Sequence, residues 1–214
     1  MFAVHLKKYL IIAKSNLKHN FHVNVVISIV LMSFAPILFG ITDLHERASA
    51  VPLEMLVALI GIVLLTPIFY PEQEQDIREL METKYTSLVG IYILRMFLAM
   101  VTILGLICMM ALLMTVNGCT FPFLKYVAGT FFSAIFLGAL GMFFYGISEQ
   151  ITIGYMISLG YYIFNITTGS RYLGKLYLFS MSESRFEEKY WLLGAACLLM
   201  FLTLLWKVIT QKNS

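Results

Sequence analysis

The chain has 214 residues, of which 60% are hydrophobic and only 13% charged, and its mean hydropathy is +0.84. Soluble domains are roughly half apolar and a quarter charged, so this composition excludes a water-soluble globular enzyme. The apolar excess must face lipid, and the length allows about six spans of roughly 20 residues. The net charge of +3 is modest, and we expect no nucleic-acid partner. The three cysteines fit neither a disulfide framework nor a zinc site.

Residues 1–20 predict an amphipathic helix on the membrane surface. The apolar residues that recur there at helical spacing are Phe2, Leu6, Tyr9, Leu10, Ala13 and Leu17. Lys7, Lys14 and Lys18 share another face, so such a helix would lie among headgroups with its lysines toward anionic lipid. The alternative is an ordinary flanking segment of the first span. No small-residue cleavage site follows, and we expect the segment to be retained.

Six apolar stretches predict six membrane-spanning helices. They cover approximately residues 21–41, 51–70, 87–116, 126–148, 151–167 and 191–206. The third is longer than a bilayer requires, which predicts a tilt or a projection into water. Only Glu149 and Gln150 separate the fourth and fifth spans, which predicts a tight hairpin. Trp191 and Trp206 at the two ends of the last span fit aromatic anchors at the membrane interfaces.

The distribution of lysine and arginine favours cytoplasmic termini. If the amino terminus is inside and the chain has six spans, the basic residues that lie outside are Arg47, Lys125, Arg171, Lys175, Arg185 and Lys189. The other 9 of the 15 lie on or near the cytoplasmic side, as the positive-inside rule expects. We therefore expect a multi-pass protein of a bacterial plasma membrane with both termini in the cytoplasm.

Two catalytic or metal-binding patterns begin in the sequence but are incomplete. Gly169, Gly174 and Lys175 have the spacing of a phosphate-binding loop, but a leucine follows where Ser or Thr is required. His45 begins a zinc-protease pattern, but Ser49 occupies the position of the second histidine. We therefore expect no catalytic activity, no metal and no cofactor in this chain.

The most polar segment, residues 71–86, predicts a short amphipathic helix in the cytoplasm. Pro71 suits the first helical position, and Lys84 lies toward the other end. The acidic residues near the start, which the helix dipole favours, are Glu72, Glu74 and Asp76. An apolar stripe at helical spacing consists of Ile77, Leu80, Met81 and Tyr85. This stripe favours a protein partner; the alternative is a helix resting on lipid, which the acidic start does not suit.

Two charged residues inside predicted spans are candidate functional positions. Glu54 lies near the outer end of the second span, and Arg95 lies early in the third. Charged side chains at such depths normally face protein or water, which makes both residues candidates for a pathway or an intramembrane polar contact. The alternative is that Glu54 reaches the outer interface and Arg95 snorkels inward.

Small residues in the fourth and fifth spans are expected to allow close helix packing. They are Gly138, Gly141, Gly146, Gly154 and Ser158. The many Met and Phe residues are expected to face lipid or to fill packing spaces. If they also line a pathway, they favour a hydrophobic or amphipathic cargo.

Taken together, these features resemble the membrane subunits (type-2 permeases) of ATP-binding-cassette transporters. The resemblance covers the amphipathic first segment, the six spans, the cytoplasmic helix with Ile77-Arg78-Glu79-Leu80, and a basic residue, Arg95, in the third span. Residues 168–190 are also similar to the family's short re-entrant helices on the outer side. The chain departs from the family in size, because many relatives are longer and some carry large outer domains.

The resemblance implies an all-α polytopic permease with one domain over residues 1–214. Residues 1–20 would be its elbow helix, and residues 71–86 a coupling helix that docks in a separate ATPase subunit. The coupling residues that it implies are Asp76, Ile77, Arg78, Glu79, Leu80, Met81 and Lys84. Two permease copies, or this chain with a similar one, would form the pathway, and the ATPase would bind ATP and Mg²⁺.

For function, the resemblance favours export of an amphipathic peptide, a lipid-like or a drug-like substrate. The alternative is a non-transporting membrane scaffold or sensor whose cytoplasmic helix docks on a partner. An integral-membrane enzyme ranks third, because the catalytic patterns are incomplete. Co-purification of an ATPase distinguishes the first two functions.

Overall fold

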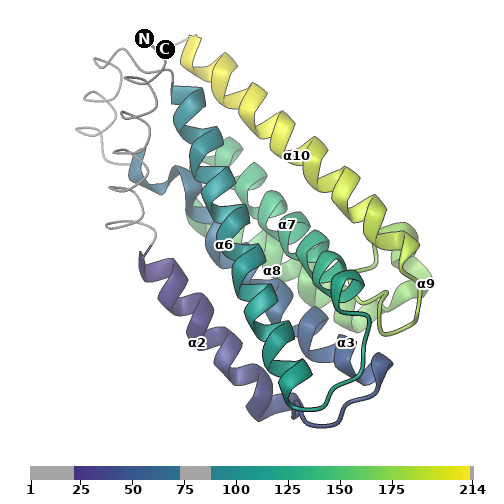
Figure 1. The fold of residues 1–214 in the computed structure, drawn as a ribbon. Helices are drawn as coiled ribbons and strands as arrows, with labels where there is room; N and C mark the ends of the chain where they lie inside the picture. Colours follow the sequence, from purple (N-terminus) through teal and green to yellow (C-terminus); the bar gives the residue numbers. More distant parts are fainter. Residues whose placement is uncertain (1–21, 73–87, 213–214) are drawn as a thin grey trace.

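The protein is described by a computed structural model that covers residues 22–72 and 88–212. Within these residues all regular structure is helical, and the helices form one bundle (Figure 1). The predicted elbow helix 1–20 lies outside the described residues. Almost all of the predicted coupling helix 71–86 lies outside them as well, including every residue to which the coupling role is assigned.

The bundle contains long helices and one broken helical segment. The long helices are α2 (His22–Phe39), α6 (Leu88–Val116), α7 (Phe123–Ser148), α8 (Ile151–Thr168) and α10 (Glu187–Lys212). The broken segment consists of α3 (Glu46–Met55), η2 (Val57–Leu59), α4 (Ile60–Leu65) and η3 (Thr66–Glu72). The connection between α8 and α10 contains α9 (Ser170–Leu173) and η4 (Gly174–Leu176).

Five of these segments in the described part of the chain are long and apolar enough to cross a membrane. They are His22–Phe39, Glu46–Tyr70, Val89–Val116, Phe123–Ser148 and Glu187–Thr210. Their positions match five of the six predicted spans, and the architecture is compatible with a multi-pass membrane protein. The predicted fifth span, α8, is not among the five, since Asn165 and several Gly, Ser, Thr and Tyr residues lower its hydropathy. Six crossings therefore stay a prediction.

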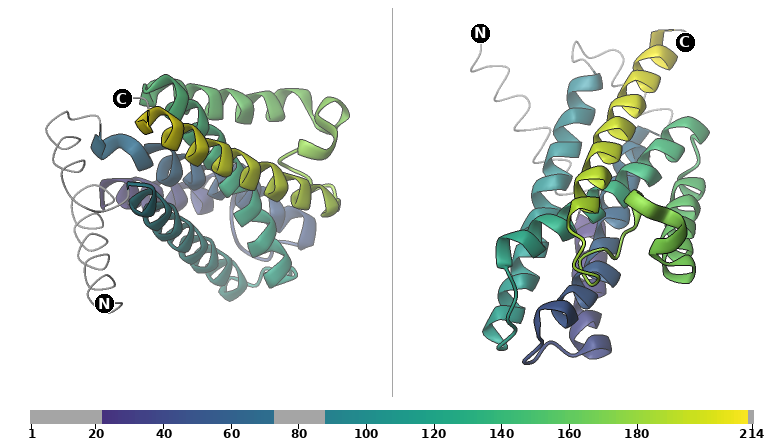
Figure 2. Two further views of the ribbon diagram at one scale, coloured as in Figure 1. Left: turned by 90° about the horizontal axis from the view of Figure 1, so that it is seen from above. Right: turned by 90° about the vertical axis from the view of Figure 1, so that its right-hand side faces the viewer.

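The connections gather at two ends of the bundle (Figures 1 and 2). At the loop end lie residues 40–45, 117–122 and 169–186. At the opposite end, called the terminal end here, lie the end of η3, the start of α6, the α7–α8 hairpin and the end of α10. Although α8 is less apolar, it runs antiparallel beside α7 and returns the chain from the hairpin to the loop end. The predicted tight hairpin is confirmed, because α7 ends at Ser148 and α8 begins at Ile151.

The second span begins earlier than predicted and is interrupted twice. The helix loses regular geometry at Leu56, where φ is −115° and ψ is −50°, and again at Pro67, where ψ is 18°. Where the helical geometry is interrupted, backbone carbonyls lose their regular donors, and in an apolar environment they need others. The Tyr162 hydroxyl donates to the Met55 carbonyl. The Arg95 guanidinium donates to the Ile68 carbonyl at 3.1 Å.

Glycines bring the central helices into close contact, as the small-residue pattern predicted. A Cβ on Gly61 of α4 would overlap the backbone of α7 at Ala134, and a Cβ on Gly138 would overlap α4 in return. Between α7 and α8, a Cβ on Gly154 would lie 2.5 Å from the Gly141 carbonyl oxygen. The broken segment and α7 can therefore approach at backbone distance and form the centre of the bundle.

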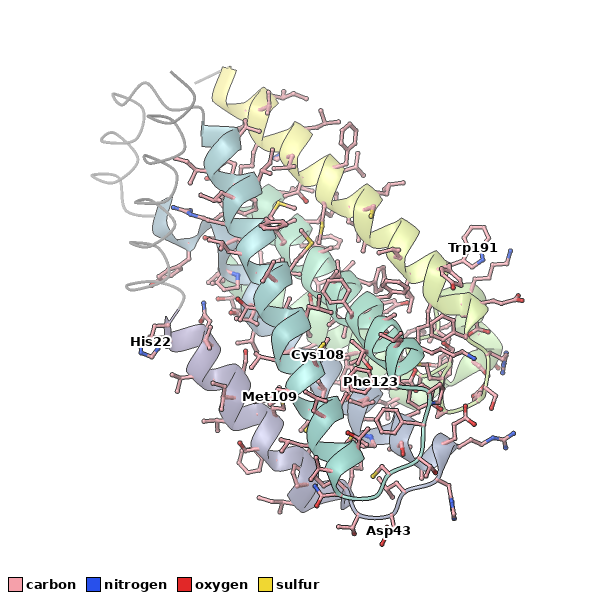
Figure 3. All side chains as sticks on the ribbon, in the orientation of Figure 1. His22, Asp43, Cys108, Met109, Phe123 and Trp191 are labelled. Atoms are coloured by element: carbon pink, nitrogen blue, oxygen red, sulfur yellow. The ribbon has the colours of Figure 1, made fainter. Side chains whose placement is uncertain are left out.

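The apolar excess of the sequence lies on the outer helices. In the most hydrophobic stretch of α2 only 17% of the residues are buried, compared with 67% in the broken segment and in α7. The corresponding share in α10 is 22%, and Trp191 at its start projects away from the bundle (Figure 3). Exposed apolar surface of this extent fits contact with lipid.

Candidate functional sites

A buried ion pair joins the broken segment to α10. The Nζ of Lys189, in the first turn of α10, lies 2.7 Å from Oε1 of Glu54 in α3. The exposed fractions of the two side chains are 0% and 1%. Isolated charges are costly in such surroundings, so a buried pair persists only where every charged atom has partners.

The charged atoms of both side chains also have hydrogen-bond partners, which come from α7 and from the segment that precedes α10. Glu54 accepts the backbone N–H groups of Met181, at 2.9 Å, and Ser182, at 3.1 Å, on its two oxygens. Lys189 also donates to Ser133 Oγ of α7, at 2.7 Å, and to the Leu178 carbonyl. Its three ammonium hydrogens thus have three acceptors. The pair ties α3, α7 and α10 to the segment that precedes α10.

That segment, residues 177–182, is called the plug here, because it enters the bundle at the loop end. It forms irregular turns, yet Leu178, Phe179, Ser180 and Met181 are all buried. The Leu178 N–H donates to Asn165 Oδ1 of α8 at 3.0 Å. Burial, with a smaller contribution from nearby carboxylates, raises the pKa of Tyr177 above its ordinary value of 10.0.

The proximity of Ser133 and Lys189 invites comparison with a serine–lysine catalytic dyad. In such a dyad the lysine must be neutral to take the proton of the serine hydroxyl. Here Lys189 pairs with the Glu54 carboxylate and donates all three hydrogens of its ammonium group, so it has no lone pair to accept a proton. Ser133 is also fully buried in α7, out of reach of a substrate. The arrangement favours a structural ion pair over a nucleophilic site.

The terminal end contains a second cluster, called the Phe69 anchor, which consists of Phe69 and its three ring contacts. The Phe69 ring of η3 lies 5.0 Å from the ring of Tyr92 in α6 and 6.0 Å from that of Tyr145 in α7, centroid to centroid. The Nζ of Lys207 in α10 lies 5.3 Å from the same ring centroid. Phe69 thus contacts three long helices just before the chain enters the segment 73–87.

Arg95 strengthens this attachment. Its side chain is 8% exposed and donates to the Ile68 carbonyl beside Phe69, so it faces protein and not the membrane surface. Lys207 also approaches the Glu149 carboxylate in the α7–α8 hairpin at 3.9 Å. The end of the broken segment is therefore connected to α6, α7, α10 and the hairpin.

The structure places the two predicted intramembrane residues at opposite ends of the same broken segment. Glu54 lies in its first helix, and Arg95 contacts its last one. The sequence pattern missed Lys189, which was expected outside the membrane. A carboxylate inside a span indicates that a cation lies nearby, but no spacing in the sequence indicates which of the distant basic residues supplies it.

Comparison with known proteins adds no family assignment. No protein-family model, curated protein or solved structure matches this chain. The function is therefore argued from the two clusters together with the sequence features.

Proposed function

We propose that this chain is the membrane permease subunit of an ATP-binding-cassette transporter, driven by a separate ATPase subunit. The observation that carries the proposal is the Phe69 anchor. The amphipathic sequence over 71–86 begins within three residues of Phe69 and has an apolar stripe that calls for a protein partner.

An external motor can move a membrane protein only if the segment it grips is rigidly attached to the spans. The Phe69 anchor supplies such an attachment, because ring contacts, a cation–π contact and the Arg95 hydrogen bond fix η3 to α6, α7 and α10. Each aromatic pair contributes about 0.5–1.5 kcal/mol beyond its buried area. A segment that served only as a flexible link would need no such fixation.

The remaining parts of the proposal follow from the resemblance. Asp76, Ile77, Arg78, Glu79, Leu80, Met81 and Lys84 would contact the ATPase. Both termini and this segment would face the cytoplasm of a bacterium, and ATP and Mg²⁺ would bind to the partner. A second permease copy, identical or similar, would complete a path for an exported amphipathic peptide, lipid-like or drug-like substrate.

The proposal is tested by purifying the tagged chain from its native membrane in a mild detergent. We expect an ATPase subunit at one-to-one stoichiometry, and its loss after the charge reversal Arg78→Glu with Glu79→Lys. The matched control is Arg47→Glu, an exposed arginine at the opposite end of the bundle, which should retain the ATPase. Purification of the intact chain without any ATPase would contradict the proposal and favour the scaffold or sensor function.

A further inference from the structure

We infer that the plug, residues 177–182, is a gate at the loop end of the bundle and that the Glu54–Lys189 ion pair is its latch. The inference deepens the proposed function, because the role of the gate in transport rests on that function. Opening would separate the plug from α3 and α8 at the loop end of the bundle.

The plug is attached to the bundle by hydrogen bonds to side chains. Its three inward backbone N–H groups, on Leu178, Met181 and Ser182, donate to the side chains of Asn165 and Glu54. No hydrogen bond of a helix has to break for these contacts to be released. The plug is thus attached through side-chain acceptors and through the burial of Leu178, Phe179 and Met181, and its release requires no loss of regular structure.

Residues with positive φ lie on both sides of the plug. Gly169 and Gly174 precede it with φ values of 70° and 52°, and no atom lies within 4 Å of a Cβ placed on either. Ser184 follows it with a φ of 63°. Loop positions that can change backbone dihedrals without a clash are the places where a hinge forms.

The contact between the plug and the bundle includes a buried ion pair. A loop that only closes the bundle is held at least as well by apolar packing, because a buried ion pair carries a large desolvation cost. The plug also buries the Ser180 hydroxyl without a hydrogen-bond partner. A buried ion pair has two discrete states, made and broken, which suits a segment that must both close and open.

The latch is connected along the chain to the Phe69 anchor. Glu54 and Phe69 belong to the same broken segment, α3 to η3, at the two ends of the bundle. At about 1.5 Å per helical residue they are on the order of 20 Å apart along it. The latch and the Phe69 anchor therefore lie on one continuous segment, through which movement at one end can displace the carboxylate at the other.

The experiment measures how readily the plug becomes accessible to water. Ser180→Cys is introduced into a chain with Cys108→Ser, Cys119→Ser and Cys197→Ser, purified without any ATPase in lipid nanodiscs, and reacted with a charged maleimide that reaches both faces. We expect slow labelling of the buried thiol. Lys189→Met, and separately the milder Glu54→Gln, should accelerate labelling by about tenfold or more, since the latch no longer opposes opening.

Two controls distinguish opening of the plug from general loss of structure. Arg185→Gln removes the contacts of a half-exposed guanidinium with Ser170, Glu183 and Glu188 in and beside the same loop and should leave the labelling rate unchanged. Ala99→Cys, fully buried in α6, should stay protected in the latch variants. Unchanged labelling of Ser180→Cys in both latch variants would overturn the inference, as would equal acceleration of Ala99→Cys. Because no ATPase is present, neither outcome bears on the proposed transport function.

Discussion

Glu54 and Lys189 show how a charged residue is accommodated inside an apolar bundle. Each side chain is buried, and each charged atom meets a partner, either the opposite charge or a backbone group of the plug. Truncation of one member of a buried pair leaves the other charge without its counter-ion, which costs stability. Truncation in an exposed pair costs little, because water replaces the lost partner.

This contrast predicts a large difference between two substitutions in the same region. Lys189→Met should lower the free energy of unfolding by about 3–5 kcal/mol, because the Glu54 carboxylate stays buried without its counter-ion. Arg185→Gln should change it by about 0–1 kcal/mol, since the Arg185 side chain is 52% exposed and water can replace its partners. Unfolding of the purified protein by increasing SDS, followed by circular dichroism, measures both. Equal stability of the two variants would show that the ion pair contributes nothing to the fold.

At the scale of the helical elements, backbone-distance packing fixes where the broken segment lies. Gly61 and Gly138 occupy facing positions of α4 and α7 that have no room for a side chain. This contact places α3 and η3 where Glu54 and Phe69 reach their partners.

Two glycine-to-alanine substitutions test this packing. Gly138→Ala should lower the free energy of unfolding by about 1–3 kcal/mol, because its methyl group would meet Leu65 and the Gly61 carbonyl. Gly160→Ala in α8, where nothing lies within 4 Å, should be neutral or stabilise by about 0.5–1 kcal/mol through helix propensity. Thermal unfolding in detergent distinguishes the two, and an unchanged midpoint for Gly138→Ala would contradict close packing of α4 against α7.

The Phe69 anchor makes a separate prediction about coupling. Phe69→Ala should leave the ATPase bound, since residues 71–86 are intact, but should abolish any ATP-dependent change in labelling of Ser180→Cys. The reason is that η3 loses its ring contacts with α6 and α7. Phe121→Ala, which removes a ring contact with Tyr126 at the loop end, is the matched control and should retain the ATP response. An ATP response in Phe69→Ala equal to that of the parent chain would exclude the anchor from coupling.

At the scale of the whole molecule, the two ends of the bundle predict two sides of the membrane. In a chain without native cysteines, Asp43→Cys and Glu183→Cys at the loop end should react with an impermeant maleimide from one side only. Glu149→Cys in the hairpin should react only from the other, because α7 separates the hairpin from the loop end. Labelling of intact cells and of inverted vesicles measures this. Reaction of all three cysteines from the same side would show that α7 does not cross the membrane.

Much of the helical architecture was predictable because lipid imposes a simple pattern on the sequence. The limits of the predicted apolar stretches agree with the ends of the helices α2, α6 and α8 to within a few residues, and the hairpin at Glu149 is confirmed. The start of the last helix at Glu187 and the break at Leu56 were not predicted. Both depend on contacts with distant residues, such as the Tyr162 hydroxyl on the Met55 carbonyl.

The sequence by itself determined that this protein is an apolar helical bundle with a polar segment at 71–86, because hydropathy and helical spacing are local properties of the chain. Only the tertiary structure decided that Glu54 pairs with Lys189, that residues 177–182 enter the bundle, and that Phe69 contacts three helices. A buried charge needs a partner wherever one lies in space, and the separation of 135 positions between Glu54 and Lys189 carries no local sign of the pairing.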